Sequence, residues 1–221
     1  MLRLHGFAVS NYFNMLQLAL ELKQVDYQQV TTYPNQQDEF LAISPMGKVP
    51  VLQTAQGCLS ETSVILDYLE ACYPEPALFP SDEFAKAKVK ELLKICELYI
   101  ELPARRCYPE VFFGQPVSEQ SKQESKRELL KGMQALKRCA KFSPYLAGDT
   151  LSAADIVFLY SVELAAIVAH KCFAIELLTL APGAQDLLTL LKQHPLVEKI
   201  AKERAAANED FRKYIASLAT K

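Results

Sequence analysis

The sequence predicts a protein in two parts, an α/β part followed by an all-α part, and three observations carry this prediction. Strand and helix patterns alternate over the first part, a proline-rich stretch follows, and beyond it every strong pattern is helical. The 221 residues suffice for two modest domains, and only seven of them are glycine, which favours helices over a turn-rich β-sandwich. We therefore expect a first domain at residues 1–73, a linker at 74–82 and a helical domain at 83–221.

The first part opens with an alternating pattern that predicts a short strand from Leu2, ending near Phe7. Apolar residues at helical spacing then predict a helix from Tyr12 to Lys23. Residues 26–33 indicate a weaker second strand, and residues 37–44 form at most a short helix.

Two further strands, 49–53 and 58–59, are close enough to form a hairpin, and they lead into a helix that ends at Pro74. The order is β-α-β followed by β-β-α, and the first crossover is long enough for parallel pairing. A small mixed sheet with helices on its faces follows, and a thioredoxin-like unit fits this order.

The second part begins after a linker that carries Pro74, Pro76 and Pro80. Its helices are recognised by apolar faces, one of which is formed by Leu92, Ile95, Cys96 and Tyr99. The run 153–169 is apolar nearly all round, as the central helix of a bundle should be. Ser152 and Asp155 precede and open it with the spacing of a capping box, and a later helix starts near Pro195.

Composition excludes several functional classes. A net charge of −2 gives no reason to expect nucleic acid or an anionic membrane as partner. The longest apolar region is interrupted by Glu163, His170, Lys171 and Glu176, which favours a buried helix over a membrane span. No secretory signal is recognisable, and the six cysteines show no metal or redox spacing, so we expect reduced thiols, no metal and a cytoplasmic location.

Four stretches carry a resemblance to a known family: "AVSNYFNMLQLAL" after the first strand, "SPMGKVPVL", "ETSVILDYL" and "LAGDTLSAADI". Their order and spacing over nearly the whole chain resemble the cytosolic glutathione transferases, in particular serine-type bacterial members. The resemblance implies glutathione as a substrate, a thioredoxin-like glutathione-binding domain, and a helical domain that contributes the electrophile site.

The resemblance also implies that the Val49–Pro50 peptide bond is cis and that the backbone of Val49 pairs with an extended peptide such as glutathione. Without it, an ordinary trans proline at the start of an edge strand would be the better interpretation, since only about 5–6% of X–Pro bonds are cis.

Lys48, Glu61 and Thr62 complete the expected glutathione site. Glu61 and Thr62 lie where a strand becomes a helix, whose free N–H groups favour a carboxylate, and Glu61 can receive an ammonium group. The γ-glutamyl end of glutathione carries both charges, and Lys48 would meet the glycyl carboxylate. The alternatives are plain N-capping by Thr62 and a solvated lysine. Thr62 stands where the family usually has serine, which keeps the hydroxyl.

Ser10 is the expected catalytic residue, because the resemblance places a serine at the end of the first strand. Its hydroxyl would donate to the glutathione sulfur and favour the thiolate, and a thiol pKa shift of about two units requires about 2.7 kcal/mol. In the competing interpretation Ser10 or Asn11 only caps the helix, although Asn11 could cap while Ser10 acts; Tyr12 is a weaker hydroxyl candidate. No cysteine occurs in "AVSNYF", which argues against a dithiol oxidoreductase.

The acceptor pocket is expected to involve Tyr12, Arg105, Arg106 and Tyr108, since an aromatic segment with a cationic edge suits an apolar electrophile. The alternative is that the aromatic residues are core and the arginines solvated. The resemblance also implies a homodimer in which an acidic residue of the neighbouring subunit completes the site for the glutathione amino group, and Glu97 and Glu101 are both compatible with that role by position.

The sequence thus predicts a glutathione transferase that attacks small hydrophobic electrophiles, with a role in detoxification. Two alternatives remain open. One is a glutathione-dependent isomerase or peroxidase, in which the glutathione half of the site would be unchanged. The other is a non-catalytic binding or regulatory protein that kept the fold.

Overall fold

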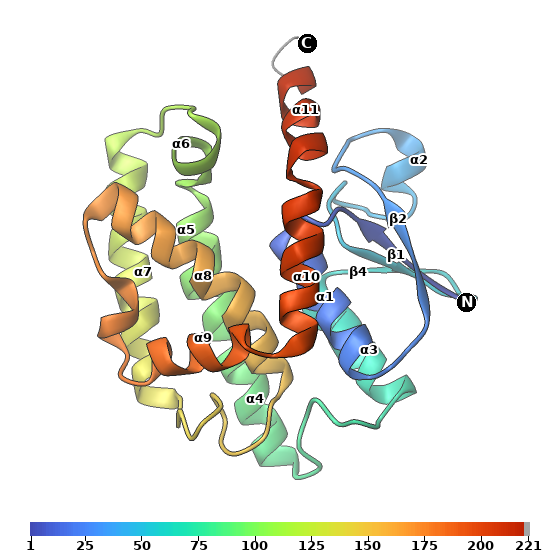
Figure 1. Cartoon of the computed structure of the whole chain (residues 1–221), viewed down its shortest axis with the longest axis horizontal. Helices are drawn as coiled ribbons and strands as arrows, with labels where there is room; N and C mark the ends of the chain where they lie inside the picture. The colour runs from blue at the N-terminus through green and yellow to red at the C-terminus, as the bar shows by residue number, and fades with distance from the viewer. Residues whose placement is uncertain (219–221) are drawn as a thin grey trace. The chain divides into compact units, whose positions relative to one another are not determined.

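The computed structural model describes residues 1–218, which divide into two compact units (Figure 1). The first unit consists of Met1–Ala77 and the chain from Gln193 onward, and the second of Leu78–Lys192. The first is the expected thioredoxin-like unit with a mixed sheet, and the second is all helical.

The sheet of the first unit has four strands in the order β2-β1-β3-β4. β1 runs parallel to β2, with Gly6 opposite Thr31, and antiparallel to β3, with His5 opposite Val51. β3 and β4 form the expected hairpin. The strands are β1 (Leu2–Gly6), β2 (Tyr27–Thr31), β3 (Val51–Gln53) and β4 (Cys58–Ser60).

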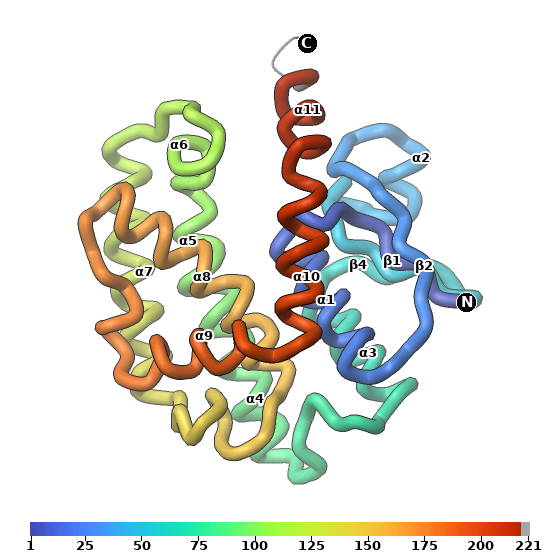
Figure 2. Tube along the Cα trace, in the orientation of Figure 1, coloured from blue at the N-terminus to red at the C-terminus, as the bar shows by residue number. Residues whose placement is uncertain are grey.

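Three helices accompany the sheet: α1 (Asn11–Leu22), which connects β1 to β2, the short α2 (Asp38–Leu41), and α3 (Thr62–Cys72), which follows β4 (Figure 2). The path of the chain between β1 and α1 depends on a close approach, because a Cβ atom on Gly6 would collide with the Phe13 ring. Gly6 also has a φ of +154°, which only glycine adopts readily. These two features place residues 7–10 directly beside the end of β1.

The far ends of α1 and α3 are joined by Lys23, whose side chain is 0% exposed. Its ammonium group lies 2.7 Å from the Glu70 carboxylate and donates to the carbonyl oxygens of Tyr73 (2.6 Å) and Pro76 (2.9 Å). All of its hydrogen-bonding capacity is therefore used, which is what makes a buried lysine tolerable.

The last two helices, α10 (Pro195–Ala206) and α11 (Asn208–Leu218), group with the first unit, whereas we expected the helical domain to continue to residue 221. Polar contacts tie α10 to α1: Gln17 donates to Glu203 (2.6 Å), and Lys199 pairs with Glu21 (2.7 Å). A continuous run of helical patterns does not reveal which helices pack together, so this boundary was invisible in the sequence. The expected domain limit also falls on residues 219–221, which lie outside the described residues.

The second unit is built around α8 (Ala153–Phe173), most of whose side chains are buried. By length and composition α8 could cross a membrane, but more than half of its most apolar stretch is buried within the protein, as expected for a core helix. The other helical segments are α4 (Glu83–Cys96), η1 (Glu97–Glu101), α5 (Leu102–Arg105), α6 (Tyr108–Phe113), α7 (Glu119–Cys139), η2 (Leu177–Leu180) and α9 (Ala184–Lys192).

The prediction of one apolar face is wrong for its last residue. Leu92, Ile95 and Cys96 are buried, but Tyr99 is 54% exposed. The reason is that η1 is a π-helical turn, in which each turn holds more residues than an α-helix, so the face that the sequence periodicity assumed is rotated.

The start of α8 confirms the expected capping box. Asp155 is fully buried and accepts hydrogen bonds from the Ser152 N–H (2.8 Å), the Ser152 hydroxyl (2.7 Å) and the Leu146 N–H (2.8 Å). Burial raises the pKa of the Asp155 carboxyl, and the hydrogen bonds from Leu146 and Ser152 oppose that rise.

Candidate functional site

Strand directions bring the predicted glutathione residues to one edge of the sheet. β1 ends four residues before Ser10, β3 begins directly after Val49–Pro50, and β4 ends directly before Glu61–Thr62. Because β3 is antiparallel to β1 and β4 is antiparallel to β3, these three points lie at the same edge. The starts of α1 and α3 therefore flank this edge.

Ser10 is the N-cap of α1, and its hydroxyl oxygen accepts the Phe13 N–H at 3.3 Å. Of the two capping residues considered, Asn11 is instead the first residue of the helix and is buried. A hydroxyl that accepts in this way still has its own proton to donate. No acceptor for that proton is found within residues 1–218. Capping and donation to a ligand are thus compatible at Ser10.

The Val49–Pro50 peptide bond is cis, as the resemblance implied. In the part of the chain that the structure describes, neither the N–H nor the C=O of Val49 takes part in a hydrogen bond. A backbone donor and acceptor are therefore available beside β3, which is the requirement for pairing with an added extended peptide.

Lys48 precedes this backbone and is fixed through its main chain. The Ser44 hydroxyl donates to the Lys48 C=O (2.6 Å) and accepts the Lys48 N–H (3.0 Å). The side chain is exposed, and its ammonium group has no ion pair within residues 1–218. The main chain of Lys48 is thus held in place, while its ammonium group is available to an anion.

Glu61 lies at the N-cap of α3 with φ +70° and ψ 112°, a conformation that residues other than glycine rarely adopt. Its carboxylate is exposed and has no partner in the described chain, and it does not cap the helix. The first helical hydrogen bond runs from Ile65 to Glu61, so the N–H groups of the first turn point out of the helix. Strain of this kind is characteristic of functional sites.

Thr62 is buried, yet its hydroxyl makes no hydrogen bond with any described residue. The alternative of plain N-capping by Thr62 is therefore wrong, because Thr62 is the first residue inside the helix and Glu61 occupies the cap position. The Thr62 hydroxyl, the Glu61 carboxylate and the outward N–H groups together offer donors and an acceptor of the kind that an amino-acid group carrying both charges requires.

The loop after β2 supports the same edge and was not anticipated from the sequence. Asn35 donates its N–H to the Gly47 C=O (3.2 Å), one residue before Lys48. Gly47 has φ +62°, and a Cβ atom there would collide with the Asn35 carbonyl, so only glycine permits this approach. The glycine in "SPMGKVP" was visible in the sequence, but its partner loop was not.

Asn14 is a second feature of the site that was not anticipated from the sequence. It lies one turn after Ser10 on α1, is fully buried, and neither polar atom of its amide finds a partner among the described residues. A buried unpaired amide is costly, about 1–3 kcal/mol for each group, and usually marks a bound water or ligand. A single asparagine in an apolar helix carries no sequence signal of this kind.

The residues expected at the acceptor pocket fall in different units. Tyr12 is in the first unit and is half-buried, while Arg105, Arg106 and Tyr108 are in the second. Arg105 pairs with the fully buried Glu101 (2.5 Å), and the Tyr108 hydroxyl donates to the same carboxylate (3.3 Å). Burial and the adjacent Glu101 charge raise the pKa of Tyr108.

Both arginines are therefore already paired, since Arg106 lies 2.8 Å from the Glu128 carboxylate. Glu101, one of the two acidic residues considered for the neighbouring subunit's site, is committed to Arg105 and Tyr108 within its own unit. Glu97, the other one, pairs with Lys94 (2.8 Å).

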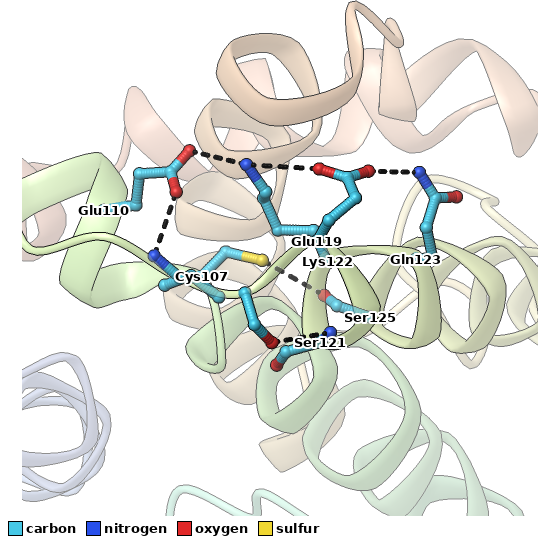
Figure 3. A network of polar contacts seen from close by, with 9 residues as sticks. Cys107, Glu110, Glu119, Ser121, Lys122, Gln123 and Ser125 are labelled. Carbon is cyan, nitrogen blue, oxygen red and sulfur yellow. Dashed lines mark hydrogen bonds and ion pairs between the residues drawn. The ribbon is translucent and has the colours of Figure 1, made fainter.

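A neighbouring polar network in the second unit is satisfied internally (Figure 3). Glu110 accepts from Lys122 (3.3 Å), which also approaches Glu119 (3.5 Å), and these contacts hold the start of α7 against α6. Cys107 donates to the Ser125 hydroxyl at 3.5 Å, and Ser125 donates in turn to the Pro103 carbonyl (2.6 Å). This network has a structural role, because its groups are bonded to one another.

Within the described range, no group of three or more histidine, cysteine, aspartate or glutamate side chains could hold a metal ion. The open groups of the sheet edge instead suit a small peptide with a free amino-acid end and a carboxylate end.

Comparison with known proteins identifies a family. A family model described as the N-terminal domain of glutathione S-transferase matches residues 4–77. A Pseudomonas putida protein named glutathione S-transferase is 48% identical over 217 residues, covering 98% of this chain and 99% of that protein. The maleylacetoacetate isomerase of Pseudomonas aeruginosa is 31% identical over 107 residues, covering 44% of this chain and 50% of that protein.

A solved structure shows the same fold. The glutathione S-transferase of Methylobacterium radiotolerans, in complex with glutathione sulfonate, has a TM-score of 0.72 and is 20% identical, covering 90% of this chain and 93% of its own.

Proposed function

Because the chain belongs to the glutathione transferase family, as its similarity to the Pseudomonas putida protein over nearly its whole length shows, we propose that it activates the glutathione thiol with Ser10 and transfers the thiolate to a small hydrophobic electrophile. The first unit binds glutathione in this proposal. Lys48 receives the glycyl carboxylate, the backbone of Val49 before Pro50 pairs with the cysteinyl residue, and Glu61 and Thr62 receive the γ-glutamyl end.

The observation that carries the proposal is the uncommitted proton of the Ser10 hydroxyl at the N-terminus of α1. A hydroxyl that donates to sulfur stabilises the thiolate relative to the thiol and lowers the thiol pKa. The positive end of the α1 dipole acts in the same direction. The thiolate, once formed, is the nucleophile.

A pH titration of bound glutathione, followed by the ultraviolet absorbance of the thiolate, tests this role. We expect a thiol pKa below that of free glutathione in the wild type, and an increase of about one to two units in Ser10→Gly, which removes the donor. Glycine caps helices nearly as well as serine, so the change in folding stability should stay within a few tenths of a kcal/mol.

Ser10→Thr is the matched control, because it keeps both the hydroxyl and the cap, and it should retain the lowered thiol pKa. A thiol pKa that is the same in the wild type and in Ser10→Gly would remove the catalytic role from Ser10. Glutathione bound with an unshifted thiol in both proteins would favour the binding or regulatory protein.

A second candidate function is glutathione-dependent isomerisation, in which glutathione is recovered. It is favoured by the similarity to the Pseudomonas aeruginosa protein, whose name is maleylacetoacetate isomerase. Product analysis separates the two candidates, since net consumption of glutathione indicates conjugation and its recovery indicates isomerisation. Peroxide reduction would instead yield glutathione disulfide.

The proposal includes a homodimer, a cytoplasmic location and a role in detoxification. Large apolar side chains are exposed in the first unit, including Met46 (61%) and Val64 (51%), and a second subunit would give them a partner surface. Six free cysteines are compatible with a reducing compartment. Sedimentation at micromolar concentration would test the dimer directly.

A further inference from the structure

One serine outside the expected site, Ser44, holds the main chain of Lys48 on both sides of its Cα atom. The Ser44 hydroxyl donates to the Lys48 C=O at 2.6 Å and accepts the Lys48 N–H at 3.0 Å. Ser44 is only 1% exposed, so water competes little for these two bonds. A single hydroxyl therefore fixes both peptide groups that flank the base of the Lys48 side chain.

Ser44 is itself held by the end of α2. Its N–H donates to the C=O of Phe40, a buried residue of that helix, at 2.8 Å. Its C=O accepts the Gly47 N–H at 2.7 Å, which closes the turn between the two residues. The main chain of Lys48 is thus connected to the core of the first unit through Ser44, whereas its ammonium group has no ion pair within residues 1–218.

Closing the loop of residues 44–48 is a simpler role for the Ser44 hydroxyl. Main-chain bonds already hold this loop, however: Gly47 donates to Ser44, and the Gly47 C=O accepts the Asn35 N–H at 3.2 Å. The hydroxyl bonds act one residue further along, at Lys48. The residue after that is Val49, whose N–H and C=O are left open in the described chain. The hydroxyl therefore orients the residues that face the ligand.

We propose that Ser44 is a positioning residue for glutathione, which acts through Lys48 and makes the site select peptides with a charged glycyl carboxylate over peptides whose glycyl end is neutral. This inference rests on the proposed function, in which Lys48 receives that carboxylate. It adds a residue that the sequence expectation did not include and assigns to it the discrimination at one end of the peptide.

The physical reason lies in the flexibility of lysine. Its ammonium group is a compact charge on a four-carbon chain, and ordering this chain on a ligand costs conformational entropy. With the main chain already fixed by Ser44, only the side chain has to be ordered when the carboxylate binds. Without the hydroxyl, the backbone dihedral angles of Lys48 must be ordered as well, and this cost is subtracted from the affinity.

Calorimetry on the full-length chain tests the proposal with two ligands, glutathione and its glycyl amide, in which a neutral amide replaces the glycyl carboxylate. The wild type should bind glutathione about tenfold or more tightly than the amide, because a hydrogen bond to a charged group is the stronger one. Ser44→Ala should reduce this preference about threefold or more. Lys48→Ala should abolish it, and the double variant should resemble Lys48→Ala, because Ser44 acts through Lys48.

The ratio of the two dissociation constants separates positioning from stability. An unfolded fraction weakens both apparent affinities equally, so the ratio stays measurable even if Ser44→Ala destabilises the protein. Lys23→Ala, a substitution at the far ends of α1 and α3, is the control: it should lower stability and leave the ratio unchanged. If Ser44→Ala also leaves the ratio unchanged, Ser44 only closes its loop and the inference is overturned.

A wild-type preference that survives in Lys48→Ala would overturn the inference too, since the carboxylate would then be bound elsewhere. Failure of the proposed function has a different signature, which is bound glutathione without a lowered thiol pKa in the wild type. Ser44→Ala should keep that lowered thiol pKa, because Ser10 lies on a separate segment at the start of α1. If the wild type binds no glutathione, the proposed function and the inference both fail.

Discussion

The starts of α8 and α3 differ in how their polar groups are used, although both are helix N-termini. At α8 the buried Asp155 carboxylate is saturated by the N–H and hydroxyl of Ser152 and the N–H of Leu146. At α3 the cap residue Glu61 has positive φ and does not cap, and the Thr62 hydroxyl has no partner among the described residues. Satisfied groups serve stability, whereas groups left open at a strained cap are available to a ligand.

The largest effect is expected at α8. Asp155→Ala leaves two backbone N–H groups without their acceptor in a buried position, so the free energy of unfolding should fall by about 3–5 kcal/mol. Urea unfolding measures this loss. Asp149→Ala, an exposed aspartate in the preceding loop, is the control and should stay within about 0.5 kcal/mol of the wild type. Equal effects of the two substitutions would contradict the structural role of the capping box.

The Lys23→Ala substitution tests whether the polar groups of the first unit that lie away from the proposed ligand site contribute to stability, as the groups at the start of α8 do. Lys23→Ala removes the cation from the Glu70 carboxylate and the donor from two carbonyl groups at the far ends of α1 and α3, so we expect a loss of about 3 kcal/mol in the same assay. Lys202→Ala, at an exposed position in the same unit, provides the comparison. A loss below about 1 kcal/mol for Lys23→Ala would mean that water replaces the ammonium group without cost.

At α3 we expect the opposite: loss of the polar group should affect ligand affinity rather than folding stability. Thr62→Val removes a hydroxyl that has no bond in the free chain, so folding stability should change by less than about 0.5 kcal/mol. Glutathione affinity, measured by calorimetry, should fall about tenfold or more, because a hydrogen bond to a charged group contributes about 1.5–3 kcal/mol. Thr62→Ser should keep the wild-type affinity. A Thr62→Val protein that is destabilised yet binds normally would reverse the distinction between the two helix starts.

The smallest effect concerns pH. Because burial raises the pKa of the Asp155 carboxyl, the folded state holds this proton more tightly than the unfolded state does. The contribution of Asp155 to stability is therefore greatest below its ordinary pKa of 3.8 and falls as the pH rises through the folded-state pKa. The difference in unfolding free energy between the wild type and Asp155→Asn should decline as pH increases over this window. A difference that grows with pH would show that the pKa is lowered.

The features of the fold that the sequence predicted correctly depend on local patterns. The helix from Thr62 and the capping box of Ser152 and Asp155 depend on residues close together in the chain, and both occur as expected. The cis bond before Pro50 came from the resemblance rather than from the residues themselves. The roles of Ser10, Lys48 and Glu61 stay predictions, although the structure leaves each of these side chains open to a ligand.

The sequence by itself determined the fold class of the protein, because periodicity and capping act over a few residues and can be recognised in a single chain. Tertiary structure alone decided that α10 and α11 join the first unit, that the two arginines of residues 105–106 are paired with carboxylates, and that Phe211 and Tyr214 stack beside Phe7 and Tyr33. These contacts join residues far apart in sequence. They depend on how complete elements pack, and no local pattern encodes which elements will meet.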